Sequence, residues 1–185
     1  MNLSPTSYAL LGLLVFDAET QTNGLTGYEL KQRADRTLRF YWVSPAMSQI
    51  YTELDRLLEG GLVSATDAQE GRRTTRRFVV SDAGRQRLQD WLATPLEDPF
   101  PILKHPVALR LLMGQLTSPQ TVVEMLDHYL DQLSDRRAEL EAVRDLLGDE
   151  EQLRYPARVA DWGLSYYDAE TEVTERLRRD VERRG

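Results

Sequence analysis

The feature that most constrains this chain is an arginine-rich stretch between two strand-like segments. Residues 62–66 and 77–80 are short runs rich in Val, Leu and Phe, which are typical of β-strands bounded by polar turns. Gly71 and four arginines, Arg72, Arg73, Arg76 and Arg77, lie at or next to the turn between them. The pattern predicts a two-stranded hairpin whose tip is positively charged.

Helical patterns flank this hairpin on both sides. A first helix is expected to begin at Ser4-Pro5 and to end before a polar loop at 17–24, and a second is expected from Thr26 to about Leu38. Thr26 and Glu29 form the spacing of a capping box, in which each side chain accepts from the other residue's backbone N–H. After the hairpin, Ser81-Asp82 is expected to cap a fourth helix that reaches Leu92.

The third helix is expected to be capped at Ser44-Pro45 and to end at Gly60-Gly61. Its apolar residues recur at helical spacing and predict one buried stripe: Met47, Ile50, Leu54, Leu57 and Leu58. Its other face carries side chains able to hydrogen-bond to bases and phosphates: Ser48, Gln49, Thr52 and Arg56. Tyr51 lies at the edge of the stripe, so two interpretations stay open: a core ring, or a half-buried ring with its hydroxyl at a phosphate.

Four prolines mark a boundary, because proline interrupts helices: Pro95, Pro99, Pro101 and Pro106. We therefore expect one domain over 1–95 and a second, helical domain over 96–185. The second domain should hold helices over 103–116 and 118–148 and one further helix to the C-terminus. Two apolar stripes in the last two helices resemble coiled-coil seams that need a partner, and we expect the dimer interface there: Leu126, Tyr129, Leu133, Leu140, Trp162, Tyr166, Val173 and Leu177.

The charge distribution favours a nucleic-acid partner despite a net charge of −7. Residues 1–95 hold 11 basic and 11 acidic side chains, so the whole negative excess lies in the second half. A local basic patch matters more than the total, because salt screens charges over roughly 8–10 Å. There is no cysteine, which fits a reducing cytoplasm. No signal peptide or membrane-spanning segment is expected.

Nothing in the sequence predicts an enzyme, a metal site or a cofactor. The two histidines, His105 and His128, are far apart and lack a neighbouring set of metal-ligand residues at a recognisable spacing. Gly-rich phosphate loops and nucleophile motifs are absent. A pair of catalytic carboxylates stays open from sequence, but the acidic residues lie mostly on predicted exposed helix faces.

The order helix, helix, helix, strand, basic turn, strand, helix is that of a winged helix-turn-helix. The predicted fold class is thus mainly α, with an N-terminal winged helix-turn-helix domain and a C-terminal helical dimerisation domain. The third helix would enter the major groove of double-stranded DNA, with the wing arginines against the backbone or minor groove. The expected DNA-binding residues are Ser44, Ser48, Gln49, Tyr51, Thr52, Arg56, Arg72, Arg73, Arg76 and Arg77. The alternative to DNA contact by the wing arginines is that they form a charged turn exposed to solvent.

These residues resemble the PadR family of regulators. The resemblance is carried by five segments: Thr26-Gly27-Tyr28-Glu29-Leu30, Trp42-x-Ser44, Gln49-Ile50-Tyr51 with Leu54 and Leu57, Gly61-Leu62-Val63, and Ser81 with Gly84-Arg85. The stretch from Trp42 to Tyr51 and the helical second half most resemble the family's AphA-like branch. The resemblance implies a dimer paired through its C-terminal helices, and a Tyr51 that touches DNA. Some members respond to phenolic acids or other small aromatics.

The expected function is therefore a sequence-specific transcriptional regulator, a repressor by the habit of the family, that binds a palindromic operator as a dimer. The alternative is a winged-helix protein-interaction module that does not bind DNA, for which the acidic second half would suit a basic partner. Aromatic residues leave a small aromatic effector open as a further partner: Tyr41, Trp42, Trp162, Tyr166 and Tyr167. For each of them, packing is the competing interpretation.

Overall fold

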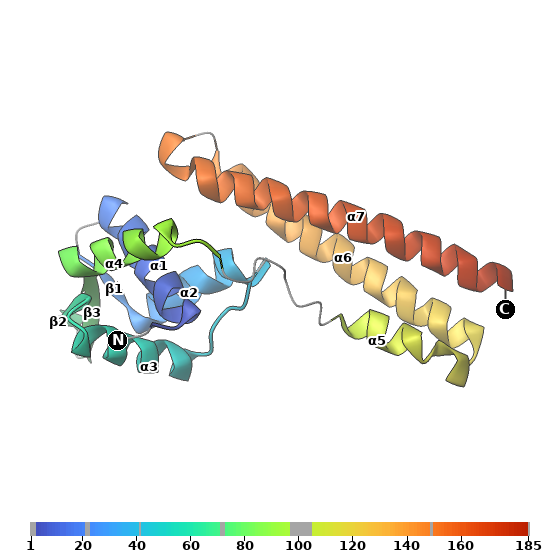
Figure 1. Cartoon of the computed structure of the whole chain (residues 1–185), viewed down its shortest axis with the longest axis horizontal. Helices are drawn as coiled ribbons and strands as arrows, with labels where there is room; N and C mark the ends of the chain where they lie inside the picture. The colour runs from blue at the N-terminus through green and yellow to red at the C-terminus, as the bar shows by residue number, and fades with distance from the viewer. Residues whose placement is uncertain are drawn as a thin grey trace. The chain divides into compact units, whose positions relative to one another are not determined.

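The chain folds into two compact units, residues Met1–Pro99 and Phe100–Gly185. This computed structural model describes residues 3–20, 23–40, 42–70, 73–96, 105–148 and 150–184. Figure 1 shows the small mixed unit that holds the N-terminus and the helical unit that holds the C-terminus.

The first unit surrounds a small sheet with helices. Its elements are α1 (Pro5–Thr20), β1 (Leu25–Thr26), α2 (Gly27–Thr37), the 3-10 turn η1 (Leu38–Phe40), α3 (Met47–Glu59), β2 (Val63–Glu70), β3 (Arg73–Val80) and α4 (Asp82–Ala93). The strands are antiparallel in the order β1-β3-β2. Phe78 in β3 pairs with Leu25 on one side and Ala65 on the other. The hairpin and its flanking helices confirm the predicted winged helix-turn-helix order (Figure 1).

One hydrophobic core joins the sheet to α1, α2 and α3. Its fully buried members include Leu10, Leu11, Leu14, Leu30, Ile50, Leu54, Leu57 and Phe78. Burying a side chain of this size contributes roughly 1.5–3 kcal/mol. The apolar stripe predicted for the third helix is thus the stripe that faces the core.

Two helix boundaries differ from the sequence expectation. The expected loop at 17–24 begins later, because α1 continues to Thr20. Asp17 is 1% exposed, and its carboxylate Oδ1 lies 2.7 Å from Nη2 of Arg33 on α2. Although burial raises the pKa of Asp17, the Arg33 guanidinium gives it an opposite charge within the fold.

Helix α3 begins later than Ser44-Pro45 predicts. Its N-cap is Ala46, which makes no side-chain cap hydrogen bond. The Ser44 hydroxyl instead donates to Asp35 Oδ1 at 2.5 Å and accepts from Lys31 Nζ at 3.1 Å. Ser44 therefore ties the segment before α3 to α2.

The second unit is a long helical hairpin. It contains α5 (Pro106–Leu112), the 3-10 turns η2 (Gly114–Leu116) and η3 (Glu151–Leu153), α6 (Pro119–Leu147) and α7 (Arg154–Arg184). The helix expected over 103–116 is shorter, and residues 103 and 104 lie outside the described residues. Ser118 caps α6 as predicted, its hydroxyl accepting from Thr121 N at 3.1 Å. Helices α6 and α7 run side by side (Figure 1).

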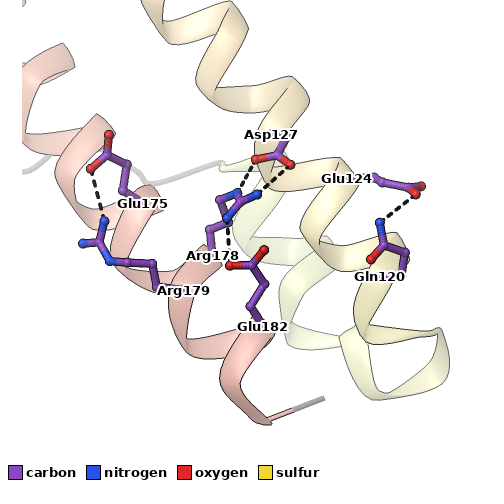
Figure 2. A network of polar contacts seen from close by, with 7 residues as sticks. All are labelled: Gln120, Glu124, Asp127, Glu175, Arg178, Arg179 and Glu182. Carbon is purple, nitrogen blue, oxygen red and sulfur yellow. Dashed lines mark hydrogen bonds and ion pairs between the residues drawn. The ribbon is translucent and has the colours of Figure 1, made fainter.

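Three ion pairs join α6 to α7 along one side, here called the closed flank. Arg137 Nε lies 2.6 Å from Asp168 Oδ1, and Arg144 Nε lies 2.7 Å from Asp161 Oδ1. At the far end Arg178 holds Asp127 with two nitrogens, and its Nη1 is 2.9 Å from Glu182 (Figure 2). The pairs fix the register of the two helices.

No helix in the described ranges has the length and apolar character needed to cross a membrane.

We predict that Gly84→Ala destabilises the chain and that Gly12→Ala does not. A Cβ on Gly84 would lie 2.1 Å from the backbone oxygen of Leu62, so α4 would have to move, at a cost of roughly 1–3 kcal/mol. A Cβ on the helical Gly12 meets nothing within 4 Å, and alanine there should stabilise by about 0.5–1 kcal/mol. Urea unfolding of the full chain measures both; equal midpoints for the two variants would contradict the packing argument.

Candidate nucleic-acid interface

Helix α3 presents a polar face to solvent. Ser48, Gln49, Thr52 and Arg56 are all exposed on it, opposite the buried stripe. The Thr52 hydroxyl donates to the Ser48 carbonyl at 3.0 Å, and the Gln49 amide donates to Thr6 Oγ1 on α1 at 3.5 Å. The face therefore carries donors and acceptors of the kind that read base edges in a major groove.

Tyr51 borders this face and packs on the start of α2. Its side chain is 48% exposed, and a Cβ on Gly27 would lie 2.7 Å from its ring atom Cε1. A side chain at position 27 would have to displace the end of this ring from its place against α2. The half-buried ring matches one of the two interpretations left open from sequence; contact of its hydroxyl with a phosphate stays a prediction.

The wing is longer than the sequence indicates. The pairing of β2 with β3 extends to Glu70 opposite Arg73. Arg72 lies outside the described residues, and the Arg73 side chain is not described. Arg76 is exposed, with Nε 3.9 Å from Oδ1 of Asp67 on the opposite strand. An exposed pair at this distance is weak, so Arg76 remains available to a phosphate.

Arg77, which is expected to contact DNA, has partners within the fold. Its Nη1 donates to the Gly24 carbonyl at 2.8 Å and to Glu29 Oε2 at 3.3 Å. Arg77 therefore fastens the base of the wing to the start of α2. Ser44, expected at the DNA, is likewise engaged with Lys31 and Asp35 on α2. Both side chains therefore have partners within the fold that no local sequence pattern indicates, and their contact with DNA stays a prediction.

Glu29 is the centre of this attachment. Burial alone would raise the pKa of Glu29, but the backbone N–H and hydroxyl of Thr26 and the Arg77 guanidinium together lower it below its ordinary value. The predicted capping box is present, with Thr26 N to Glu29 Oε2 at 2.7 Å and Glu29 N to Thr26 Oγ1 at 3.2 Å. One carboxylate thus caps α2 and anchors β3.

Sequence reasoning missed a buried acid on α3. Glu53 is only 4% exposed. Its Oε2 accepts a short hydrogen bond from the Ser7 hydroxyl of α1, and its Oε1 lies 2.9 Å from Nη1 of Arg56. Its position between Ile50 and Leu54 on the apolar stripe was the available signal, because a charge there needs partners.

Seven of the eight residues expected to form the dimer interface fall into two groups. Leu126, Leu133 and Leu140 are buried in α6, which packs against α7. Four residues of α7 are exposed instead: Trp162, Tyr166, Val173 and Leu177. Their spacing of 4, 7 and 4 places them on one helix face, here called the open flank. Of these two groups, the second is the one exposed on the surface of the described chain.

Tyr129 takes part in a polar cluster within the second unit. Its hydroxyl donates to Glu170 Oε1 at 3.2 Å, and His105 Nε2 lies 2.7 Å from the same oxygen. Beside it, a cavity of about 450 Å³ is lined in part by Tyr129, Arg136, Tyr166 and Tyr167. Within the described ranges, no group of three or more His, Asp or Glu residues could hold a metal ion.

Comparison with known proteins finds similarity to one family of regulators. The profile described as the transcriptional regulator PadR-like family matches residues 18–90. The negative transcriptional regulator PadR of Bacillus subtilis is 29% identical over 175 residues, which cover 94% of this chain and 88% of that protein.

Solved structures agree on the fold over nearly the whole chain. Bacillus subtilis PadR in complex with operator DNA gives a TM-score of 0.80 at 22% identity, covering 96% of this chain and 99% of that one. The same protein with p-coumaric acid gives 0.72 at 21% identity, covering 95% and 98%. The Vibrio cholerae virulence activator AphA gives 0.70 at 17% identity, covering 97% and 99%. The fold is thus shared with a negative transcriptional regulator and with a virulence activator.

We predict that Arg77→Ala lowers stability in a pH-dependent way, whereas Arg76→Ala does not. Losing the charge-assisted bonds to Gly24 and Glu29 should cost about 1–3 kcal/mol at pH 7. The lowered pKa of Glu29 means that its contribution is present above the unfolded pKa, near 4.3, and is lost as the pH falls through the folded value. The deficit of Arg77→Ala should therefore shrink below about pH 4. Chemical unfolding from pH 3 to 7 measures it; a constant deficit would contradict the ion pair.

Proposed function

We propose that this chain, which is similar to the transcriptional regulators of the PadR-like family, binds operator DNA through α3 and the β2–β3 wing. The observation that carries the proposal is the exposed polar face of α3, where Gln49 donates a hydrogen bond to Thr6 of α1. The solved structure of Bacillus subtilis PadR in complex with operator DNA, which shares this fold, supports it. The family is one of regulators and not of enzymes.

In this proposal the two elements do different work. Helix α3 lies in the major groove, where Ser48, Gln49 and Thr52 face base edges that distinguish all four base pairs. The wing lies along the backbone, where Arg76 and the arginines at its tip add affinity by releasing counterions. Arg77 and Ser44 hold these elements in place.

We propose that two chains pair through the open flank of α7. The closed flank is bridged by ion pairs and suits solvent, whereas the open flank exposes Trp162, Tyr166, Val173 and Leu177 in one row. A two-fold pairing would bury this row on both chains at once. It would also present two α3 helices to a palindromic operator.

We also propose repression and a small aromatic effector, by analogy with the negative regulator PadR of Bacillus subtilis and its complex with p-coumaric acid. The cavity beside Tyr166 offers a place for such a ligand, since it combines tyrosine rings with the Arg136 guanidinium. It borders the open flank, so a ligand there would alter the pairing of two chains. A regulator of this kind works in the cytoplasm, with its DNA.

The first test of this function distinguishes recognition of the base sequence from nonspecific electrostatic binding to the DNA backbone. A duplex enriched by the wild-type protein from random DNA serves as the operator. Gln49→Ala and Thr52→Ala should lose about 1–3 kcal/mol of discrimination between this duplex and an altered one. Arg76→Ala should instead weaken binding to both alike and lower the salt slope by about one. Failure of the wild-type protein to enrich any sequence would favour a protein-interaction module.

The second test concerns the pairing surface. Leu177→Glu should shift the full chain from dimer to monomer, because it places a charge in the open flank. Operator affinity should then fall by roughly a hundredfold or more, since two half-sites are no longer linked. Ala138→Glu, at an exposed position of α6, is the control and should leave the dimer intact. Sedimentation velocity measures both; an unchanged Leu177→Glu dimer would remove this flank from the interface.

A further inference from the structure

Glu53 is an unusual residue for the buried stripe of a helix that faces DNA. It is 4% exposed and sits between the fully buried Ile50 and Leu54. A carboxylate in such a place is costly unless hydrogen bonds and an opposite charge compensate it. Its two oxygens are divided between two neighbours: Ser7 on α1 and Arg56 on α3 itself.

The hydrogen-bond directions can be assigned along this chain of contacts. The Ser7 hydroxyl has one hydrogen, and it is donated to Glu53 Oε2. The contact of 3.2 Å between the hydroxyls of Ser4 and Ser7 must then be donated by Ser4. Ser7 itself is fully buried. Glu53 is thus held from the start of α1, the same segment whose Thr6 contacts Gln49.

Arg56 is the outward end of this chain. Its side chain is 57% exposed, and only Nη1 lies against Glu53, at 2.9 Å. The Nε–Nη2 edge of the guanidinium is therefore available for two acceptors that lie side by side. Guanine N7 and O6 present such a pair in the major groove. A guanidinium that is fixed before binding loses less rotamer freedom when it makes this contact.

We propose that Glu53 is a positioning residue that makes Arg56 a guanine-reading side chain. The proposal rests on the proposed DNA binding and deepens it. The Glu53 carboxylate also offsets the charge of Arg56, so the pair attracts phosphate weakly and contributes mainly when a guanine lies opposite. Glu53 thereby raises specificity at the expense of nonspecific affinity.

The proposal predicts opposite changes in two affinities. Glu53→Gln keeps an oxygen that can accept from Ser7 or Arg56 but removes the charge that fixes the guanidinium. Affinity for the enriched operator should fall about tenfold, as for one lost bidentate base contact. Affinity for unrelated duplex should rise about two- to threefold, and its salt slope should steepen by up to about one, because Arg56 is freed for phosphate. Glu59→Gln removes the same charge from an exposed position of α3, and should leave the ratio of the two affinities unchanged.

The experiment uses full-length protein and the operator enriched by the wild-type chain, with each guanine replaced in turn by 7-deazaguanine. Wild type should lose about tenfold affinity at one position in each half-site, where N7 is the acceptor. Arg56→Ala and Glu53→Gln should lose little at that position, and the double variant should behave as Arg56→Ala alone. Additive losses, or equal losses on operator and unrelated duplex, would overturn the proposal in favour of a phosphate contact or a purely structural role.

A second variant covers the case in which Glu53→Gln unfolds. Ser7→Ala keeps the Glu53–Arg56 pair and removes only its attachment to α1, and thermal unfolding identifies the folded proteins. It should lower the operator preference in the same direction, and an unchanged preference would overturn the role of this attachment. A wild-type chain that enriches no sequence would instead refute the proposed function.

Discussion

Helix α3 packs one face into the hydrophobic core and exposes the other to solvent, and the rest of the first unit depends on this orientation. Ile50, Leu54 and Leu57 are completely buried, so the rotation of the helix about its axis is fixed by the core. The residues a third to half a turn away are then necessarily exposed. Because a helix places side chains at fixed angles, burying the stripe also aims Ser48, Gln49 and Thr52 at solvent. The packing of the core therefore also determines which side chains form the polar face.

The start of α1 adds a second layer of control that packing alone does not give. Thr6 and Ser7 lie behind α3 and hydrogen-bond to Gln49 and Glu53. Long polar side chains on an exposed helix face otherwise sample many rotamers. The first helix of the chain thus restrains Gln49, which would meet DNA, and the buried Glu53 beside it, while Arg77 and Glu29 restrain the wing.

Local signals were sufficient for much of this structure. The Thr26–Glu29 capping box, the Ser81 and Ser118 caps and the α3 stripe were predicted because each depends on residues within about one or two helical turns. The sequence predicts DNA contacts for Ser44 and Arg77 but does not reveal their partners within the fold, Asp35, Gly24 and Glu29, because these lie 9 to 53 positions away. Glu53 was overlooked for the same reason, since its partner Ser7 is 46 positions away. Side-chain roles set by tertiary contacts leave no periodic pattern.

The second half shows why one stripe of apolar residues does not specify one interface. Sequence periodicity grouped Leu133 and Leu140 with Trp162 and Leu177, but the hairpin buries the first pair within the chain and leaves the second pair exposed. The two sides of α7 differ because the ion pairs Arg137–Asp168 and Arg144–Asp161 lie on the closed flank, whereas the open flank is apolar. Some of the acidic residues of this half thus stabilise the hairpin, because those on α7 pair with arginines on α6. Its remaining negative charge repels phosphate, which favours DNA contact through the first unit, where basic and acidic residues balance and the arginines gather on the wing.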